Sequence, residues 1–266
     1  MGDSTGALPS AIGSFDEIRR QMAGKCIAVF LDYDGTLTPI VAHPDLAILS
    51  DDMRAVVRDL AGRCTVAVVS GRDLQDVRGH VEIDALYYAG SHGFDLAGPD
   101  GLSIEHEIGR EFLGELDAAE KQLTRQLASI QGAWAERKRY AIAVHYRQVA
   151  DADVPTIEHE VDAIVDARGS LRKTGGKKVF EVRPRVDWHK GKAVRWLLET
   201  LNLGGSGTLP IYIGDDVTDE DAFEALRMDG LGVVVMEEPR PTAARYSLRD
   251  TDEVGRFLGM LDSELA

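Results

Sequence analysis

An unbroken apolar run over residues 27–31 ends at Asp32, and a second acidic residue, Asp34, follows in the segment Asp-Tyr-Asp-Gly-Thr. A strand that is apolar at every position is typical of a parallel sheet buried on both faces. In open sheets of this kind, ligands bind beyond the carboxyl ends of the strands. The run therefore predicts an α/β fold and places Asp32 where a ligand would bind.

Strand and helix patterns alternate in two separate stretches of the chain. Apolar runs predict strands at 27–32, 65–70, 86–89, 211–213 and 232–235. Apolar residues at helical spacing predict helices at 15–22, 53–60, 72–78, 194–201, 219–227 and 254–261. This alternation is typical of a doubly wound parallel sheet with right-handed crossovers.

The pattern between the two stretches is different. Amphipathic helices are predicted at 112–130 and 154–165, and strands at 134–138, 141–148, 171–174 and 179–182. Gly175 and Gly176 separate the last two strands and predict a hairpin turn there. We therefore expect a core made of residues 1–96 and 187–266, with an inserted α+β domain at 97–186.

Composition limits the function classes. The formal net charge of −15 argues against a nucleic-acid or anionic-membrane binder, and an anionic substrate would need local positive charge. Cys26 and Cys64 are expected to be buried reduced thiols, because two cysteines make no disulfide framework. Neither a signal-peptide pattern nor an apolar stretch of about 20 residues occurs. We expect a cytoplasmic monomer without nucleic-acid or membrane partners.

The spacing of Asp32 and Asp34 has a chemical consequence. Two carboxylates this close repel each other unless a cation or a proton lies between them. Magnesium, a hard cation that takes oxygen ligands, meets this need. A solvated turn is the alternative, since Asp and Gly are common turn residues. The buried strand that leads into the pair favours the metal site.

The segment Asp-Tyr-Asp-Gly-Thr resembles the first motif of the haloacid dehalogenase superfamily of phosphohydrolases. The other three motifs of that superfamily have matches in the same order along the chain. They are Ser70 at the end of a strand, Lys190 at the start of a helix in WHKGKA, and the acidic run GDDVTD at 214–219. The resemblance implies a doubly wound core of this superfamily and a phosphoryl-transfer reaction.

The resemblance also implies roles for individual residues. Asp32 would attack phosphorus and form an aspartyl-phosphate. Asp34 would give a proton to the leaving oxygen and later take one from water. Ser70 would donate hydrogen bonds to the phosphoryl oxygens, and Lys190 would offset their charge at a helix start.

Magnesium is the cofactor that the resemblance implies. Asp32, the Asp34 backbone carbonyl and Asp215 are its expected ligands. Asp216 and Asp219 are further candidates, and the sequence leaves open which of these two contacts the metal.

A narrower resemblance, to the trehalose-6-phosphate phosphatase family, comes from GDDVTDEDAF, GSHG at 90–93, HYR at 145–147 and KKVFEVRP at 177–184. One departure is His189, where that family more often has Asn. This resemblance implies hydrolysis of trehalose 6-phosphate to trehalose and phosphate in trehalose biosynthesis, with the insert as a cap that binds the sugar. The implied substrate contacts are Ser70, Gly71, Arg72, His92, His145, Arg147, Lys177, Glu181 and Lys190.

Three other functions compete with this one. Another capped sugar-phosphate enzyme, such as a sucrose-phosphate or glycosyl-glycerate phosphatase or a phosphosugar mutase, shares the motifs. A non-catalytic sugar-phosphate sensor is disfavoured, because a sensor would be expected to lack part of the charge set that is complete here. A dinucleotide site at GGSG 204–207 is excluded, because that loop precedes a strand, whereas the fingerprint must follow one.

Overall fold

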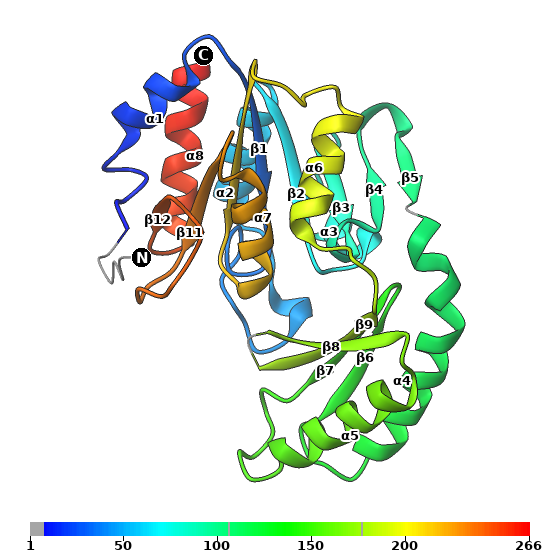
Figure 1. Cartoon of the computed structure of the whole chain (residues 1–266). Helices are drawn as coiled ribbons and strands as arrows, with labels where there is room; N and C mark the ends of the chain where they lie inside the picture. The colour runs from blue at the N-terminus through cyan, green and yellow to red at the C-terminus, as the bar shows by residue number, and fades with distance from the viewer. Residues whose placement is uncertain (1–7, 106, 177) are drawn as a thin grey trace. The chain divides into compact units, whose positions relative to one another are not determined.

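Two units make up the chain in the computed structural model, which describes residues 8–105, 107–176 and 178–266 (Figure 1). The first comprises Met1–Ile104 and His189–Ala266, and the second Glu105–Trp188. The second unit therefore begins and ends later in the chain than the inserted domain expected at 97–186. The first division is later because a strand pair after Gly93 extends the sheet of the first unit.

An eight-stranded sheet with the order β12-β11-β10-β1-β2-β3-β4-β5 forms the centre of the first unit. Neighbouring strands from β12 to β3 are parallel, and β4 is antiparallel to β3. The α/β class predicted from sequence is confirmed. The strands are β1 Cys26–Leu31, β2 Thr65–Val69, β3 Tyr87–Gly90, β4 Asp95–Ala97, β5 Ser103–Glu105, β10 Thr208–Gly214, β11 Leu231–Val235 and β12 Tyr246–Leu248.

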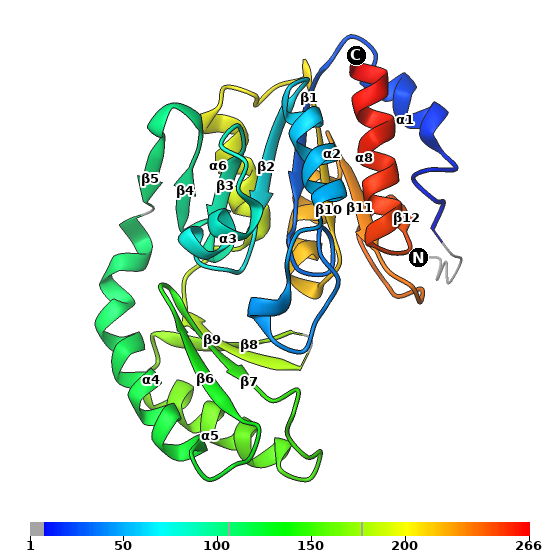
Figure 2. The same ribbon diagram turned by 180° about the vertical axis from the view of Figure 1, so that it is seen from behind.

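Helices cover both faces of this sheet, as Figures 1 and 2 show from opposite sides. Strand β1 explains why both faces need cover, since Val29 and Leu31 join one apolar cluster, and Ala28 and Phe30 the other. The first cluster includes residues of four helices, α1 Phe15–Met22, α2 Asp51–Ala61, α3 Leu74–Val81 and α8 Thr251–Leu265. The second cluster includes residues of two helices, α6 Lys190–Thr200 and α7 Glu220–Leu226.

The second unit is a four-stranded antiparallel sheet with the order β6-β7-β9-β8. Its strands are β6 Trp134–Lys138, β7 Ala141–His145, β8 Leu171–Gly176 and β9 Val179–Pro184, and its helices are α4 Leu113–Leu127 and α5 Val154–Ala167. The helices pack with Ile142, Val144, Phe180 and Val182 on one face of the sheet. Because side chains alternate along a strand, His145 and Glu181 belong to the opposite face.

Two local predictions were wrong. Gly175 and Gly176 lie within β8 and pair with β9, so the chain reverses after Gly176 and not at the glycine pair. The cysteines are free but not buried, since Cys26 is exposed at the first position of β1 and Cys64 is half-buried. Burial of the Cys64 thiol still raises its pKa to about 12.

Among the described residues, no helix has both the length and the apolar character needed to span a bilayer.

Candidate active site

The strand order reverses at β1. From β1 the chain continues through β2 and β3 on one side, whereas β10, β11 and β12 lie on the other. Asp32 follows β1 directly and Asp215 follows β10 directly, and β1 and β10 are parallel neighbours. The two carboxylates therefore meet at the switch point, where ligands bind in open α/β sheets.

Three buried carboxylates gather at this point. One ligand oxygen from each of Asp32, Asp215 and Asp219 lies within 4.8 Å of the other two, the arrangement that a metal ion would need. Asp216, a predicted candidate, lies outside this group and caps the next turn by accepting the Val217 N–H at 2.7 Å. The Asp34 side chain is also outside the group.

Lys190 is the cation of this cluster. Its Nζ donates to Asp32 Oδ1 at 2.8 Å and to Asp219 Oδ1 at 2.7 Å, and the side chain is 3% exposed. It is the first residue of α6, as the sequence predicts. Burial alone would lower the pKa of Lys190, but the adjacent Asp219 and Asp32 carboxylates raise it above its usual value. Lys190 is therefore a fixed positive charge beside Asp32.

The carboxylate of Asp219 is occupied by protein donors. Oδ1 accepts from Lys190 Nζ and from the Tyr212 hydroxyl at 2.7 Å, and Oδ2 accepts the backbone N–H groups of Asp215 at 3.0 Å and Asp216 at 2.9 Å. Burial would raise the pKa of Asp219, but Lys190 and these hydrogen bonds lower it. Of the two candidates left open by the sequence, Asp219 lies with the cluster, and it also holds the loop that carries Asp215.

The cluster has an excess of negative charge. Burial raises the pKa of Asp32 well above its usual range; Lys190 opposes this shift, and Asp219 and Asp215 add to it. Among the described residues, Lys190 donates to two of these three carboxylates, Asp32 and Asp219. An all-oxygen donor set in this setting fits a hard divalent cation such as Mg²⁺.

Gly35 brings the Asp34–Gly35 backbone against Asp215. Its φ of +86° lies in the region that favours glycine, and a Cβ built there would be 2.2 Å from Asp215 Oδ2. No side chain fits in this space. The glycine of the first motif is therefore required by the close approach of the loop to the Asp215 carboxylate.

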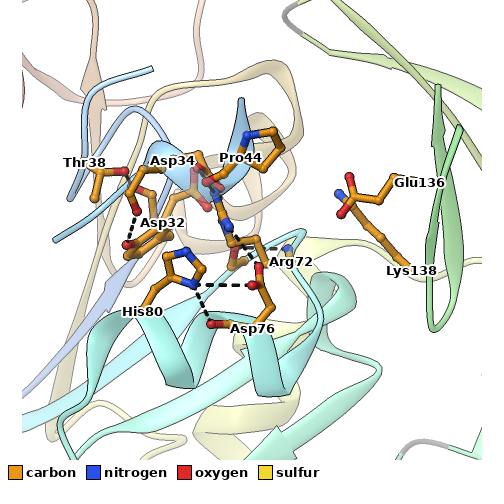
Figure 3. A network of polar contacts seen from close by, with 12 residues as sticks. Asp32, Asp34, Thr38, Pro44, Arg72, Asp76, His80, Glu136 and Lys138 are labelled. Carbon is orange, nitrogen blue, oxygen red and sulfur yellow. Dashed lines mark hydrogen bonds and ion pairs between the residues drawn. The ribbon is translucent and has the colours of Figure 1, made fainter. Parts of the chain in front are cut away.

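Arg72 holds the Asp34 carboxylate through two hydrogen bonds (Figure 3). Its Nε donates to Asp34 Oδ2 at 2.7 Å and its Nη2 to Asp34 Oδ1 at 2.8 Å. The remaining donors bind Asp76 Oδ2 and the Pro44 carbonyl, both at 2.8 Å. Burial would lower the pKa of Arg72, but Asp34 and Asp76 raise it, so the guanidinium stays charged. Such a two-point contact fixes direction as well as charge.

Two predicted substrate contacts, Ser70 and Gly71, follow β2 directly, and a third, His92, follows β3. Ser70 is buried, its Oγ accepts the Arg72 N–H at 3.1 Å, and its carbonyl accepts the His92 N–H at 2.8 Å. A Cβ at Gly71 would lie 2.7 Å from the His92 ring, so a larger residue at position 71 would require the ring to move. His92 itself has a φ of 58° and is buried.

The other predicted sugar contacts belong to the second unit. His145 Nε2 lies 2.7 Å from Glu136 Oε2, and its ring stacks on Trp134 with centroids 4.0 Å apart. Glu181 accepts from Lys138 Nζ at 3.3 Å and from Arg183 Nε at 2.6 Å. Arg147 is exposed beyond the end of β7, and Lys177 lies outside the described residues.

Several polar residues of these clusters were not predicted. Glu136 and Lys138 alternate with other residues along β6, and the strand pairing puts them on one face with His145 and Glu181. Because residues two apart in a strand lie on the same face, the spacing of Glu136 and Lys138 predicts that they share a face of the sheet. For Asp76 the signal is its spacing of four residues from Arg72.

Comparisons with known proteins agree with this geometry. The family model for trehalose-phosphatase matches residues 30–252. "Probable trehalose-phosphate phosphatase D" from Arabidopsis thaliana is 43% identical over 264 residues, covering 95% of this chain and 72% of the relative.

Two solved structures share the fold. "Trehalose-6-phosphate phosphatase related protein" aligns with TM-score 0.77 and 26% identity, over 89% of this chain and 97% of that one. The C-terminal domain of the Candida albicans trehalose-6-phosphate phosphatase aligns with TM-score 0.81 and 22% identity, over 98% of this chain and 99% of that one.

Proposed function

Because the chain belongs to the trehalose-phosphatase family, within the haloacid dehalogenase superfamily, we propose that it hydrolyses trehalose 6-phosphate by Mg²⁺-dependent phosphoryl transfer to Asp32. The chain is a phosphatase of the hydrolase class. The observation that carries the mechanistic proposal is the buried cluster of Asp32, Asp215 and Asp219 around Lys190, at the point where the strand order reverses.

Asp32 is the nucleophile in this proposal. An Asp32 carboxylate oxygen forms a bond to phosphorus while the bond from phosphorus to the sugar oxygen breaks, which leaves an aspartyl-phosphate and a free sugar. Water then attacks phosphorus, the aspartyl–phosphorus bond breaks, and phosphate leaves. Lys190 supports this assignment, because it orients the Asp32 carboxylate at 2.8 Å and carries a positive charge for the phosphoryl oxygens.

Asp34 moves the protons. It gives one to the sugar oxygen that leaves in the first step, and it takes one from the attacking water in the second. Arg72 is a positioning residue for Asp34, because its guanidinium donates to both carboxylate oxygens and so fixes their direction. The guanidinium itself is held by Asp76 and the Pro44 carbonyl. Ser70, at the end of the neighbouring strand, donates to a phosphoryl oxygen.

The metal would be held by Asp32, Asp215 and the Asp34 backbone carbonyl. Asp219 completes the acidic group and, through its hydrogen bonds to the 215–216 peptide units, keeps Asp215 in place. When bound, Mg²⁺ neutralises negative charge on the reacting phosphoryl group. The same cation would relieve the repulsion among the buried carboxylates.

The second unit is proposed to be the cap that binds the sugar. One face of its sheet is covered by helices, and the other presents Glu136, Lys138, His145, Glu181 and Arg183. Lys138 and Arg183 donate to Glu181, and the His145 ring contacts Glu136, so this face offers both the donors and the acceptors that sugar hydroxyls require. Closure of the cap over the substrate would exclude water from the reaction.

Phosphate release from a panel of sugar phosphates tests the substrate. The panel contains trehalose 6-phosphate, sucrose 6-phosphate, a phosphorylated glycosyl-glycerate and glucose 6-phosphate, each with Mg²⁺ or with a chelator. We expect a kcat/KM for trehalose 6-phosphate at least about tenfold above the others, because buried polar groups reject a sugar that leaves them unpaired. Chelation should stop turnover, and added Mg²⁺ should restore it. Equal rates for glucose 6-phosphate would refute the substrate, and binding without turnover would favour a sensor.

Replacement of Arg72 by Gln separates its two possible roles. If Arg72 positions Asp34, kcat should fall by roughly 10²-fold with KM for trehalose 6-phosphate nearly unchanged, because misplacement of a reacting group by about 1 Å costs that much. If Arg72 binds the sugar, as the sequence predicts, KM should rise instead. Steady-state kinetics give both values, and Arg78→Gln on helix α3 is the matched control.

A further inference from the structure

Arg240 joins two segments of the first unit that are far apart in sequence. It lies in the loop between β11 and β12, and its Nη1 donates to Glu220 Oε1 at 2.8 Å. Its Nη2 donates to the backbone carbonyl of Asp215 at 3.2 Å. None of the four motifs contains Arg240, and the proposed mechanism assigns it no part.

The Asp215 residue is held from three directions. Its N–H donates to Asp219 Oδ2 at 3.0 Å, and its carbonyl accepts from Arg240. Its carboxylate lies against Gly35, where even a Cβ would be 2.2 Å from Oδ2. Because both peptide groups of Asp215 are fixed, the direction in which its carboxylate leaves the backbone is fixed too.

Glu220 holds Arg240 in position for this contact. Its Oε2 accepts from the Thr242 hydroxyl at 3.0 Å and from the Ala243 N–H at 2.8 Å, while its Oε1 accepts from Arg240. Glu220 is also the first residue of helix α7, directly after Asp219. The Glu220 carboxylate therefore connects the loop between β11 and β12 to the residue that follows the acidic motif. The Arg240 guanidinium contacts both Glu220 and the Asp215 carbonyl.

We propose that Arg240 is a positioning residue for the phosphoryl-transfer site, which sets the divalent-cation affinity by fixing the Asp215 peptide. The inference rests on the proposed function, in which Asp215 is a metal ligand. Groups that orient a metal ligand without touching the metal typically change affinity or activity 10–100-fold when removed. An arginine that merely anchored the loop would affect stability and leave cation binding unchanged.

Calorimetric titration of the full chain with Mg²⁺, without substrate, tests this role. Arg240→Gln should bind Mg²⁺ roughly 10–100-fold more weakly than the unsubstituted chain. Arg245→Gln, an exposed arginine of the same loop, should bind it unchanged. Thermal unfolding without metal, measured on the same samples, shows whether a loss of affinity merely follows from a loss of fold.

Two further variants distinguish a failure of the proposed Arg240 role from a failure of the proposed metal site. Arg240→Lys keeps the charge but not the fork that bridges two acceptors, so it should also bind Mg²⁺ more weakly, and it replaces Arg240→Gln if that variant does not fold. Asp215→Asn should lose most Mg²⁺ affinity. Tight binding by Asp215→Asn would refute the metal site and with it the proposed function. Weak binding by Asp215→Asn together with unchanged binding by both Arg240 variants would overturn the role of Arg240 alone.

Discussion

Replacement of Asp32 by Asn is expected to lower phosphate release by at least about 10³-fold, as expected when a catalytic nucleophile is removed. The amide oxygen can still accept from Lys190, so the fold should remain. Stability without metal should even increase. Burial, with Asp219 and Asp215, raises the folded-state pKa of Asp32. A carboxyl with a raised folded-state pKa binds more protons in the folded than in the unfolded state, so its ionisation costs stability as the pH rises.

The measurement is steady-state phosphate release together with thermal unfolding in chelator over a range of pH. The unfolding temperature of Asp32→Asn should exceed that of the unsubstituted chain at neutral and higher pH. This difference in unfolding temperature should shrink as the pH falls towards the usual pKa of Asp. Asp84→Asn, an exposed position, should change neither quantity. Near-normal phosphate release by Asp32→Asn would refute the nucleophile assignment.

Replacement of Lys190 by Met is expected to have the largest effect on stability. It removes the partner of two buried carboxylates, and breaking a buried ion pair in this way typically costs about 3–5 kcal/mol. Without the lysine, burial should raise the pKa of Asp219 as it does that of Asp32. The folded state then binds more protons than the unfolded state, so the variant should lose further stability as the pH rises above the usual pKa of Asp.

Denaturant unfolding at several pH values checks this expectation. Lys192→Met, two positions along the same helix, is the matched control and should unfold close to the unsubstituted chain. Added Mg²⁺ should recover part of the stability of Lys190→Met, since it supplies charge to the same carboxylates. A Lys190→Met chain that is as stable as the Lys192→Met chain would mean that the buried cluster is not ionised.

The central strands of the core are predictable from sequence, and its edges are not. Strand β1 is buried on both faces, so its residues form an unbroken apolar run. Strands β4, β5 and β12 have three residues each, too few to show a period. The hairpin of β8 and β9 was predicted, but glycine preference alone placed its turn inside β8.

The site is predictable where position along a strand decides it. Asp32 and Asp215 follow strands that pair with each other, so topology brings them together. Asp216 and Asp219 stay ambiguous in the sequence, because only side-chain directions put Asp219 in the cluster and Asp216 at a helix cap. Arg240 could not be found, because its contact with Asp215 depends on the path of a loop with no periodic pattern.

Trapping the phosphorylated enzyme tests the assignment of Asp32 as the nucleophile most directly. Acid quenching during turnover of trehalose 6-phosphate, followed by borohydride reduction, converts an aspartyl-phosphate to homoserine, and peptide mass spectrometry then locates the change. We expect the modification at Asp32, only with both substrate and Mg²⁺ present, and none in Asp32→Asn. Modification at Asp34 or elsewhere, or active turnover with Asp32 unmodified, would contradict the assignment of Asp32 as the nucleophile.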